Sequence, residues 1–419
     1  MQLKKPGSIK KALSIATLTL LGSTAVATQA EEPKGKWELD TAFLYYSESD
    51  RVSVFEPIFN AKLNLKDDAS INMKLVVDAL TGSSPNGAIA FNTPQTFTRP
   101  SNNGSYTAGA NETPLDPNYR DIRVALSAEW IKPLGKTLKG IFGAYGSREI
   151  DYTSFGISGT LSKDFNNRNT TLTTGLAISQ DSVDPLGGVP LGLSVMPAPG
   201  VVKAKTGSTD DKQVVDLLIG LTQVISRKML MQFNFTYGQD DGYLTDPYKI
   251  LTILTPGGAL DPVPATPYIY EKRPDVRKRK ALYWQTVYQV NSKQTLRGSY
   301  RYYWDDWGIK SHTVDFRYRF NLGGGKHFIQ PHFRYYIQDK ADFYYYNLVT
   351  GATPTYASAD FRLADMSTRT IGVKYGRKLG KRSEFGVRLE SMKQSSEDSG
   401  APFPDVDAII LQVNYSIKF

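Results

Sequence analysis

The sequence contains no cysteine and only a few histidines. Without a thiol, these 419 residues can form no disulfide, no thiol nucleophile and no cysteine-linked lipid anchor. The three histidines, His312, His327 and His332, show none of the spacings, such as HExxH, that bind a catalytic metal. The sequence therefore predicts no metal, no cofactor and no catalytic residue, and a stability that rests on hydrogen bonds and packing.

Long apolar runs are also missing after the N-terminal segment. A helix that crosses a membrane needs about 18 or more consecutive, predominantly apolar residues, and the chain has no such run. This excludes a helical membrane protein. A membrane-spanning β-barrel stays allowed, because its strands alternate apolar and polar residues.

The one notable apolar run lies at the N-terminus. Four lysines among the first eleven residues precede "ALSIATLTLLG", and small residues follow up to Ala30. This order is typical of a secretory signal peptide cleaved after Ala30 or Ala27, with a short amphipathic helix as the alternative. We therefore expect a signal peptide over 1–30 and one domain over 31–419. Without those lysines the formal charge falls from +9 to +5, so the sequence gives little support to a nucleic-acid partner.

Segments of alternating apolar and polar residues recur along the rest of the chain. "MQFNFTYG" and "HTVDFRYRF" are examples, and about sixteen such segments can be recognised. An even number suits a single-chain bacterial barrel. Pro57 interrupts one of them, "VSVFEPIFNAKLNL", and predicts a β-bulge there.

The connections between these segments alternate between short and long. Every second connection is short, as in "KDD", "PLGK" and "LGKR". The long connections all fall in the other class, at 80–118, 182–210, 240–278, 340–366 and 393–405. An up-and-down meander puts the two kinds at opposite ends. We therefore predict an all-β fold, a transmembrane antiparallel barrel of about sixteen strands in the outer membrane of a Gram-negative bacterium, with short periplasmic turns and long extracellular loops.

The last segment, "DAIILQVNYSIKF", keeps its alternation to the final residue. Tyr415, Ile417 and Phe419 share its apolar face. Because hydrocarbon leaves no strand edge unpaired, we expect this strand to close the barrel against the segment near Trp37. Its ending also resembles the signal that delivers outer-membrane proteins to the barrel-assembly machinery, which makes that machinery an expected partner.

Three stretches carry a resemblance to a known family: "VDALTGSSPNGA" at 77–88, "DGYLTDPYK" at 241–249 and "YEKRPDVRKRKAL" at 270–282. In this order, with the C-terminal strand, they resemble the outer-membrane barrel family labelled domain of unknown function 3570, over nearly the whole mature chain. The resemblance implies an outer-membrane barrel and supplies no activity, ligand or catalytic residue. It also implies a gene neighbourhood with a small lipoprotein and a flavin-attaching enzyme, hence a periplasmic lipoprotein as a possible partner.

Alternation predicts which charged residues face the barrel interior. In three successive segments, the alternate positions predicted to face the interior are occupied by basic residues, one acid and one histidine. They are Arg297, Arg301, Asp315, Arg317, Arg319, His332 and Arg334. Such a wall favours anions in pores. The alternative is that these arginines pair with interior acids such as Asp315 and Glu390 and hold the barrel together.

The densest basic run, "EKRPDVRKRK", lies at 271–280. We expect its cations to face lipid and lipopolysaccharide headgroups, since each basic residue near an anionic surface contributes about 1 kcal/mol; a substrate funnel is the alternative. They are Lys272, Arg273, Arg277, Lys278, Arg279 and Lys280. Aromatic residues at 302–307 and 344–346 are expected in interfacial girdles. The acidic stretches "DSVD", "TDDK", "QDDGY" and "WDDW" are expected to be solvated turns and not calcium loops.

These features favour a channel or porin-like transporter of a solute across the outer membrane. A non-conducting envelope scaffold, or an export or assembly partner of a lipoprotein or redox system, is the alternative. A barrel hydrolase would need a rim histidine beside a nucleophile, whereas His332 is expected in the middle of a strand.

Overall fold

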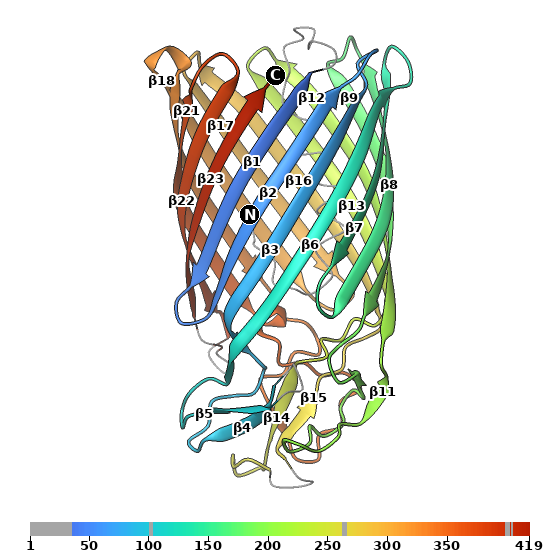
Figure 1. The fold of residues 1–419 in the computed structure, drawn as a ribbon, viewed down its shortest axis with the longest axis vertical. Helices are drawn as coiled ribbons and strands as arrows, with labels where there is room; N and C mark the ends of the chain where they lie inside the picture. Colours follow the sequence, from blue (N-terminus) through green and yellow to red (C-terminus); the bar gives the residue numbers. More distant parts are fainter. Residues whose placement is uncertain (1–35, 100–103, 262–265, 399–402, 404) are drawn as a thin grey trace.

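The computed structural model describes residues 36–99, 104–261, 266–398, 403 and 405–419. The expected signal peptide lies outside the described residues. The chain forms one closed barrel of sixteen antiparallel strands, as predicted, with each strand beside its neighbours in chain order (Figure 1). Among the described residues no helix has the length and apolar character needed to cross a membrane.

The barrel strands run in an up-and-down order. Their bounds are β1 Trp37–Glu48, β2 Val52–Asn64, β3 Ser70–Pro85, β6 Leu115–Pro133, β7 Leu138–Arg148, β8 Tyr152–Phe165, β9 Thr170–Val183, β12 Asp210–Ser226, β13 Met229–Gly242, β16 Val276–Asn291, β17 Gln294–Asp305, β18 Lys310–Leu322, β19 His327–Gln338, β21 Met366–Lys378, β22 Ser383–Ser396 and β23 Val406–Lys418.

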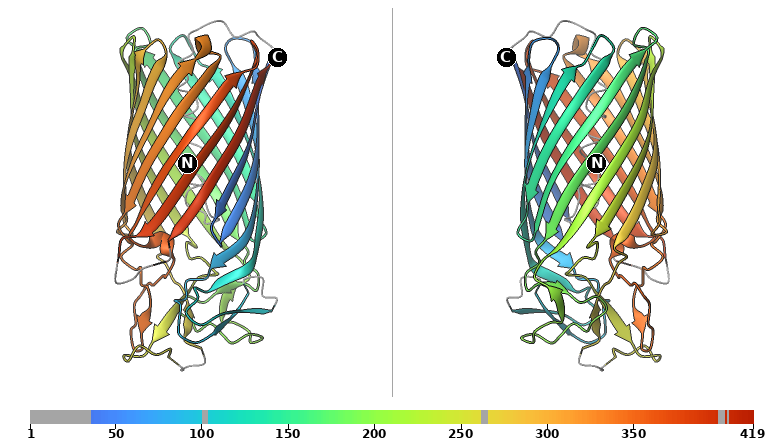
Figure 2. Two further views of the ribbon diagram at one scale, coloured as in Figure 1. Left: turned by 90° about the vertical axis from the view of Figure 1, so that its left-hand side faces the viewer. Right: turned by 90° about the vertical axis from the view of Figure 1, so that its right-hand side faces the viewer.

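The remaining elements belong to the loops. They are the short strands β4 Gln95–Thr98, β5 Ser105–Ala108, β10 Val189–Pro190, β11 Lys205–Gly207, β14 Ile250–Leu254, β15 Tyr268–Tyr270 and β20 Leu348–Val349, with two 3-10 turns, η2 Gly323–Gly325 and η3 Phe361–Leu363. The strands form three small sheets, in the orders β4–β5, β10–β11 and β15–β14–β20. Figures 1 and 2 show these sheets gathered beyond one end of the barrel, which we call the cap.

The connections are sorted between the two ends of the barrel. The loops 86–114, 184–209, 243–275 and 339–365 all leave from the cap end, whereas the opposite end has turns such as 65–69, 134–137 and 227–228. The C-terminus lies at the turn end (Figure 1). The alternation of short and long connections in the sequence therefore corresponds to a real asymmetry of the molecule.

Strand alternation gives the barrel an apolar exterior. Outward residues such as Ile122, Leu126 and Phe155 are 57%, 59% and 60% exposed, and they share strands with inward polar residues. Large exposed aliphatic and aromatic side chains occur on the outer face around the barrel. A continuous apolar band on a closed sheet is the surface that a bilayer requires, because every strand edge is paired and lipid contacts only side chains.

The barrel closes between β1 and β23, as predicted. Tyr415 lies opposite Thr41 and Ile417 opposite Leu39, and the Phe419 amide donates to the Trp37 carbonyl at 2.9 Å. The bulge prediction at Pro57 is wrong. The β2–β3 register is the same on both sides of Pro57. The residues of β2 at this position are not paired with β3, but no extra residue is inserted.

Two glycines mark the points where strands leave the barrel for the cap. Gly82 in β3 has a φ of +121°, and a Cβ there would lie 2.2 Å from the Arg51 carbonyl oxygen. Gly242 at the end of β13 has a φ of +110°, and its Cβ would lie 2.3 Å from the Asp211 carbonyl oxygen. Only glycine combines this backbone conformation with such close approach.

The cap has its own apolar cores. One contains Phe97, Tyr106, Ile250 and Tyr268, and the Phe97 ring lies 5.4 Å from Tyr106 and 4.8 Å from Tyr268. A second core joins the 243–275 loop to the 339–365 loop. It buries residues of both loops, such as Leu251, Ile269, Leu348, Ala357 and Ala359. The long loops are therefore a packed structure in their own right.

Candidate lumen site and its cap

The basic residues of β17, β18 and β19 lie on one face, opposite the exposed Phe316 and Phe333. That face is the inside of the barrel. In the strand register Arg297 is beside Arg317, and Arg317 is beside His332. One row nearer the cap, Asp315 is beside Arg334. The structure therefore brings the seven interior candidates together on one wall, which continues with Lys374 of β21 and Arg388 of β22.

Some members of this wall form a chain of ion pairs. His332 Nε2 lies 2.8 Å from Asp315 Oδ2, and its Nδ1 lies 2.7 Å from Glu390 Oε1. Arg317 continues the chain at one end, with Nε 3.1 Å from Asp315 Oδ1, and Arg388 Nε lies 3.7 Å from Glu390 at the other. Only an imidazolium donates from both nitrogens, so two ionised carboxylates match that form of His332. This geometry fits a structural bridge.

A glycine makes the long reach of His332 possible. Glu390 lies on β22, and β21 separates it from His332 on β19. The intervening position in the register is Gly372, which is beside both residues. A Cβ on Gly372 would lie 2.4 Å from Glu390 Cγ. The imidazole can therefore cross β21 only because this position has no side chain.

Four other arginines of the wall have no such partner. Among the described residues, Arg297, Arg301, Arg319 and Arg334 form no ion pair with an acid within 4 Å. The guanidinium of Arg301 lies over the Tyr303 ring, 5.2 Å from its centre. Arg319 donates from Nε to Asn321 at 3.0 Å and lies 3.6 Å from the centre of the Phe328 ring. Both interpretations of the sequence thus have residues that fit them.

The wall formed by β7, β8 and β9 has a different chemistry. Its inward positions carry small hydroxyl residues and glycine, including Ser147, Ser154, Gly156, Ser158, Thr160, Ser162, Thr171, Thr173, Gly175 and Ser179. Some bond to each other across strands, as Ser162 and Thr173 do at 3.1 Å. One side of the interior is therefore mostly cationic, whereas this side is mostly uncharged and polar, with the carboxylates of Asp164 and Asp181 bonded to Thr171 and Ser154.

Arg277 and Arg279 were expected at lipid headgroups, but both are buried on the inner face of β16. Arg277 pairs with Asp305, and Arg279 Nη2 lies 2.6 Å from Asp240 and 3.1 Å from Asp216. Asp305 belongs to "WDDW" and Asp240 to "QDDGY", so these two are buried ion-pair partners instead of solvated turn residues. The expectation failed because alternation within the basic run directs every second cation inward.

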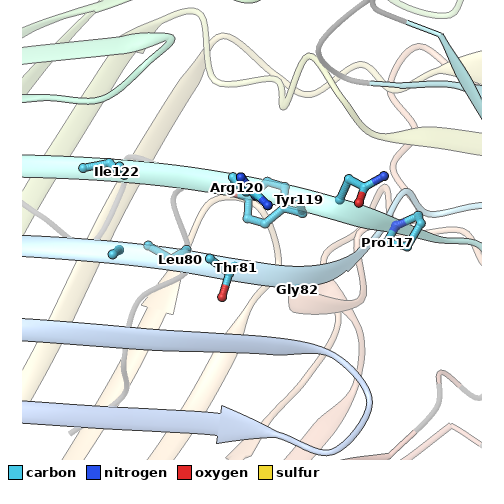
Figure 3. Close-up of a pocket in the computed structure, with 9 residues that line it drawn as sticks. Leu80, Thr81, Gly82, Pro117, Tyr119, Arg120 and Ile122 are labelled. Atoms are coloured by element: carbon cyan, nitrogen blue, oxygen red, sulfur yellow. The ribbon is translucent and has the colours of Figure 1, made fainter.

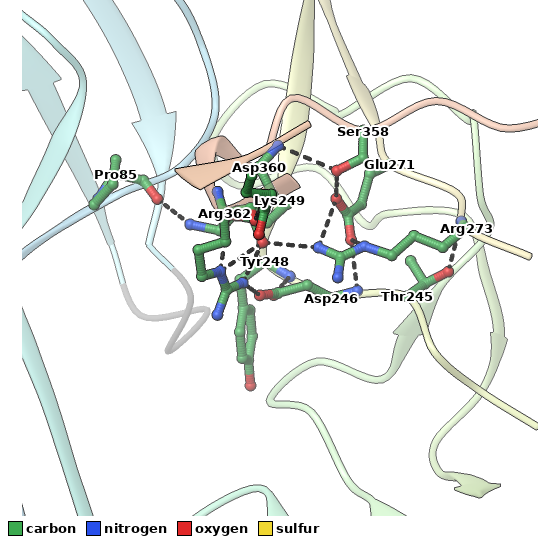
Figure 4. Close-up of polar contacts among 11 residues, drawn as sticks. Pro85, Thr245, Asp246, Tyr248, Lys249, Glu271, Arg273, Ser358, Asp360 and Arg362 are labelled. Atoms are coloured by element: carbon green, nitrogen blue, oxygen red, sulfur yellow. Dashed lines mark hydrogen bonds and ion pairs between the residues drawn. The ribbon is translucent and has the colours of Figure 1, made fainter. Parts of the chain in front are cut away.

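Arg273 lies in the cap, within a buried network that joins two loops (Figure 4). Its Nε is 2.7 Å from Glu271, and its Nη2 is 2.9 Å from Asp360. Arg362 forms two bonds to Asp360, at 2.8 and 2.7 Å, and one to Asp246 at 2.8 Å. Three cations, Lys249, Arg273 and Arg362, thus share a largely buried site with three carboxylates, and the headgroup expectation for Arg273 is corrected as well.

Further bonds tie this network to its surroundings. Lys249 Nζ donates to the Pro85 carbonyl at the end of β3, and the Asp246 amide donates to Glu271 at 2.6 Å. The Ser358 hydroxyl donates to Glu271 and accepts from the Asp360 amide at 3.1 Å. The network therefore holds the 243–275 and 339–365 loops to each other and to the barrel mouth.

The network shifts the pKa values of its members. Burial opposes ionisation of Asp360, but Arg362, Arg273 and Lys249 outweigh it and hold the pKa of this carboxyl far below its usual range. Burial raises the pKa of Glu271, although Arg273 opposes that change. Burial also lowers the pKa of Lys249. Asp360 is thus the central anion of the cap.

The other members of the basic run lie elsewhere. Lys278 and Lys280 share the outward parity of β16 with Leu282 and Trp284, so their exposure to headgroups stays a prediction. Lys272 is half-buried in the cap, where its amide and carbonyl bond to Ala357.

The girdle prediction applies to only some of the aromatic residues. Tyr302 and Trp304 are on the outer face, stacked at 5.1 Å. Trp307 and Tyr344 are buried in a core at the mouth, and Tyr303 faces inward, with its hydroxyl 2.6 Å from Asp305. Consecutive aromatic residues in a strand cannot all face lipid, since neighbours point to opposite sides.

A half-open groove of about 370 Å³ lies near the cap end of β3 and β6 (Figure 3). Thr81, Gly82, Pro117, Tyr119 and Arg120 are among the residues that line it. It lies beside the point where β3 bends and the register with β6 shifts, between Gly82 and Ser84. The groove combines residues of both strand faces and has no cluster of catalytic side chains.

Sequence reasoning missed Asp246, Lys249, Asp360 and Arg362 as site residues. Asp246 and Lys249 do occur in the family-like stretch "DGYLTDPYK", but nothing in the spacing gives them a role. Within the described residues no group of three or more His, Asp or Glu side chains is placed to hold a metal ion.

The closed sheet, its apolar exterior and its polar, charged interior define an outer-membrane β-barrel. The chain belongs to the family DUF3570, described as proteins of unknown function, whose model matches residues 10–417. No curated protein matches the sequence.

Similar solved structures are also outer-membrane proteins. Pseudomonas aeruginosa OccK5 (OpdH) has a TM-score of 0.42 and 11% identity over 92% of this chain and 98% of its own. OpdK from the same organism has a TM-score of 0.40 and 10% identity over 92% and 99%. The Acinetobacter baumannii siderophore receptor PirA has a TM-score of 0.42 and 9% identity over 90% and 58%. Likenesses this distant carry no argument about function.

Proposed function

We propose that this protein is an outer-membrane channel that favours anionic solutes and whose mouth is covered by the cap. A barrel of sixteen strands is wide enough for an aqueous passage. The observation that carries the proposal is that interior arginines, among them Arg297, Arg301 and Arg334, lack an acidic partner among the described residues. Unmatched guanidinium groups along a pore attract anions and repel cations.

The paired charges support the same function in another way. Arg317, Asp315, His332 and Glu390 balance one another and so fix the wall. The hydroxyl wall of β7, β8 and β9 offers donors and acceptors that are mostly uncharged. A solute between the two walls would meet a field directed across the lumen, which orients molecules that carry a negative group.

The test is conductance in planar bilayers, with folding checked by mobility in gels before and after heating. We expect discrete current steps and a reversal potential that reports anion preference under a salt gradient. The triple variant Arg297→Gln, Arg301→Gln and Arg334→Gln should lose most of that preference, and the matched Lys variants should keep it. Lys132→Gln serves as a charge control, because Lys132 lies on the outer face at the turn end, over the Trp130 ring. Silence from folded protein, both in the parent and in a variant with a loosened cap, would reject the channel; an unchanged reversal potential would reject the arginine wall.

A second candidate is a non-conducting envelope component that works with a periplasmic lipoprotein or another partner. The folded cap favours it, since apolar cores and a balanced charge network join two loops across the mouth. The same recordings separate the two: a scaffold gives no current in the parent protein or in a variant with a loosened cap, whereas a capped channel gains current when the cap loosens. Tyr415, Ile417 and Phe419 remain proposed contacts for the barrel-assembly machinery.

A further inference from the structure

On the outer face of the barrel, two lysines flank a tryptophan in one row near the cap. In the register Lys280 of β16 is beside Trp304 of β17, and Trp304 is beside Lys310 of β18. The lysines are thus two strand spacings apart, about 10 Å between Cα atoms. Both have side chains long enough to reach one group placed over the indole ring.

Neither lysine is neutralised. Among the described residues, Lys280 and Lys310 form no ion pair within 4 Å. The next outward residue beside Lys310 is Asp339, whose amide donates to the Lys310 carbonyl. Its carboxylate forms no ion pair with Lys310 and marks the end of the cationic row on that side. Lys278 adds a third exposed cation one position closer to the rim, where its amide donates to Asp306 at 2.8 Å.

The row sits where apolar surface meets polar surface. Towards the turn end, the same strands expose Leu282, Trp284 and Phe316 at 50%, 43% and 47%. Aromatic rings lie between these apolar side chains and the lysines. Tyr302 stacks on Trp304, and the His312 ring and the Tyr300 hydroxyl share a hydrogen bond of 2.7 Å. Tyrosine and tryptophan settle at headgroup depth, so we expect the two ammonium groups at the level of lipid phosphates.

A neighbouring part of the barrel lacks this pattern. On β8, β9 and β12 a row near the cap presents Thr153, Ser182 and Asp211 to the outside. The cationic patch therefore does not extend over these strands, although Arg369 of β21 and Lys393 of β22 are also side by side on the outer face near the cap. Local charge combined with fixed aromatic rings is complementary to one anionic, acyl-bearing molecule.

We propose that Lys280, Trp304 and Lys310 form a binding site for the phosphate group of a lipid in the membrane leaflet at the cap end. The lysines bind the phosphate, Trp304 and Tyr302 contact the sugar or glycerol part below it, and acyl chains lie on Leu282, Trp284 and Phe316. The inference does not depend on the proposed channel, since it concerns the outer face alone.

The test uses native mass spectrometry of the purified, folded protein in detergent, titrated with bis-phosphorylated lipid A and separately with its dephosphorylated form. We expect a saturable complex with the first only. Lys280→Gln with Lys310→Gln should weaken it by roughly 30-fold, because each lysine near an anionic surface contributes a few-fold to tenfold in affinity. Arginine at both positions should restore binding.

The matched control is Lys132→Gln with Lys163→Gln. These lysines also lie on the outer face over aromatic rings, 5.1 Å from Trp130 and 5.3 Å from Phe165, but at the turn end. The control should bind like the parent protein. Equal binding of the dephosphorylated lipid, an undiminished complex in the Lys280 and Lys310 variant, or an equal loss in the control would each overturn the site.

Discussion

The cap network and the arginine wall both concentrate charge, but they balance it differently. In the cap, Lys249, Arg273 and Arg362 meet three carboxylates, and Glu271 and Asp360 are 0% and 1% exposed. On the wall, the acids are outnumbered: Asp315, Glu384 and Glu390 lie among Arg297, Arg301, Arg317, Arg319, Arg334, Lys374 and Arg388.

The difference follows from access to water. An ion removed from water costs several kcal/mol unless a partner and hydrogen bonds replace its hydration. A largely buried network in the cap therefore needs a matched set of charges. A wall that borders an aqueous lumen can keep cations without partners, and these are the ones available to a solute. Under the proposed function, the matched charges have a structural role and the unmatched arginines act on the solute.

The largest effect is expected in the cap. Asp360→Asn leaves Arg273, Arg362 and Lys249 without their central anion, and breaking a buried pair of this kind costs about 3–5 kcal/mol. Hydrogen exchange should show the amides of Asp246, Glu271 and Ser358 losing protection while barrel amides keep theirs. Asp339→Asn, at an exposed acid without an ion pair, is the control. Full protection in the Asp360 variant would mean that the apolar cores alone hold the cap.

A smaller effect is expected on the wall. In Gly372→Ala the new Cβ collides with Glu390 and separates it from His332, which leaves a buried polar group unsatisfied at a cost of about 1–3 kcal/mol. The urea midpoint of the folded barrel in detergent should fall accordingly. Gly159→Ala, another strand glycine with nothing within 4 Å of its Cβ, should leave the midpoint nearly unchanged. Equal midpoints for the two variants would show that the bridge contributes little.

The smallest effect is expected from mild acid. Because the pKa of Asp360 is lowered, its contribution to stability is complete above the ordinary Asp value of about 4 and disappears only as the pH falls through the lowered value. Glu271 has a raised pKa, so its protonation as the pH falls favours the folded cap. Between pH 7 and pH 5, cap protection corrected for intrinsic exchange should therefore change by less than about 1 kcal/mol. A cap that loosens in this range would need another titrating group.

The barrel could be predicted from the sequence because strand alternation is local. A period of two gave the strand number, the inward parity of Arg317 and His332, and the closing pair of strands. The cap could not be predicted, since its contacts join distant positions: Arg273 and Asp360 are 87 residues apart. The prediction for the basic run failed for a related reason. Neither the charge of the run nor the density of its cations reveals that Arg277 and Arg279 pair with buried acids on other strands.

The seam between β1 and β23 also has a kinetic consequence. Other neighbouring barrel strands are hairpins or are joined by a single loop, whereas Thr41 and Tyr415, which bond across the seam, are 374 residues apart in sequence. Compared with a connection of about ten residues, closing a loop of that length costs roughly 3 kcal/mol more in chain entropy. We therefore expect β1 and β23 to pair last, and until they do their two free edges are where assembly is most exposed to wrong pairing.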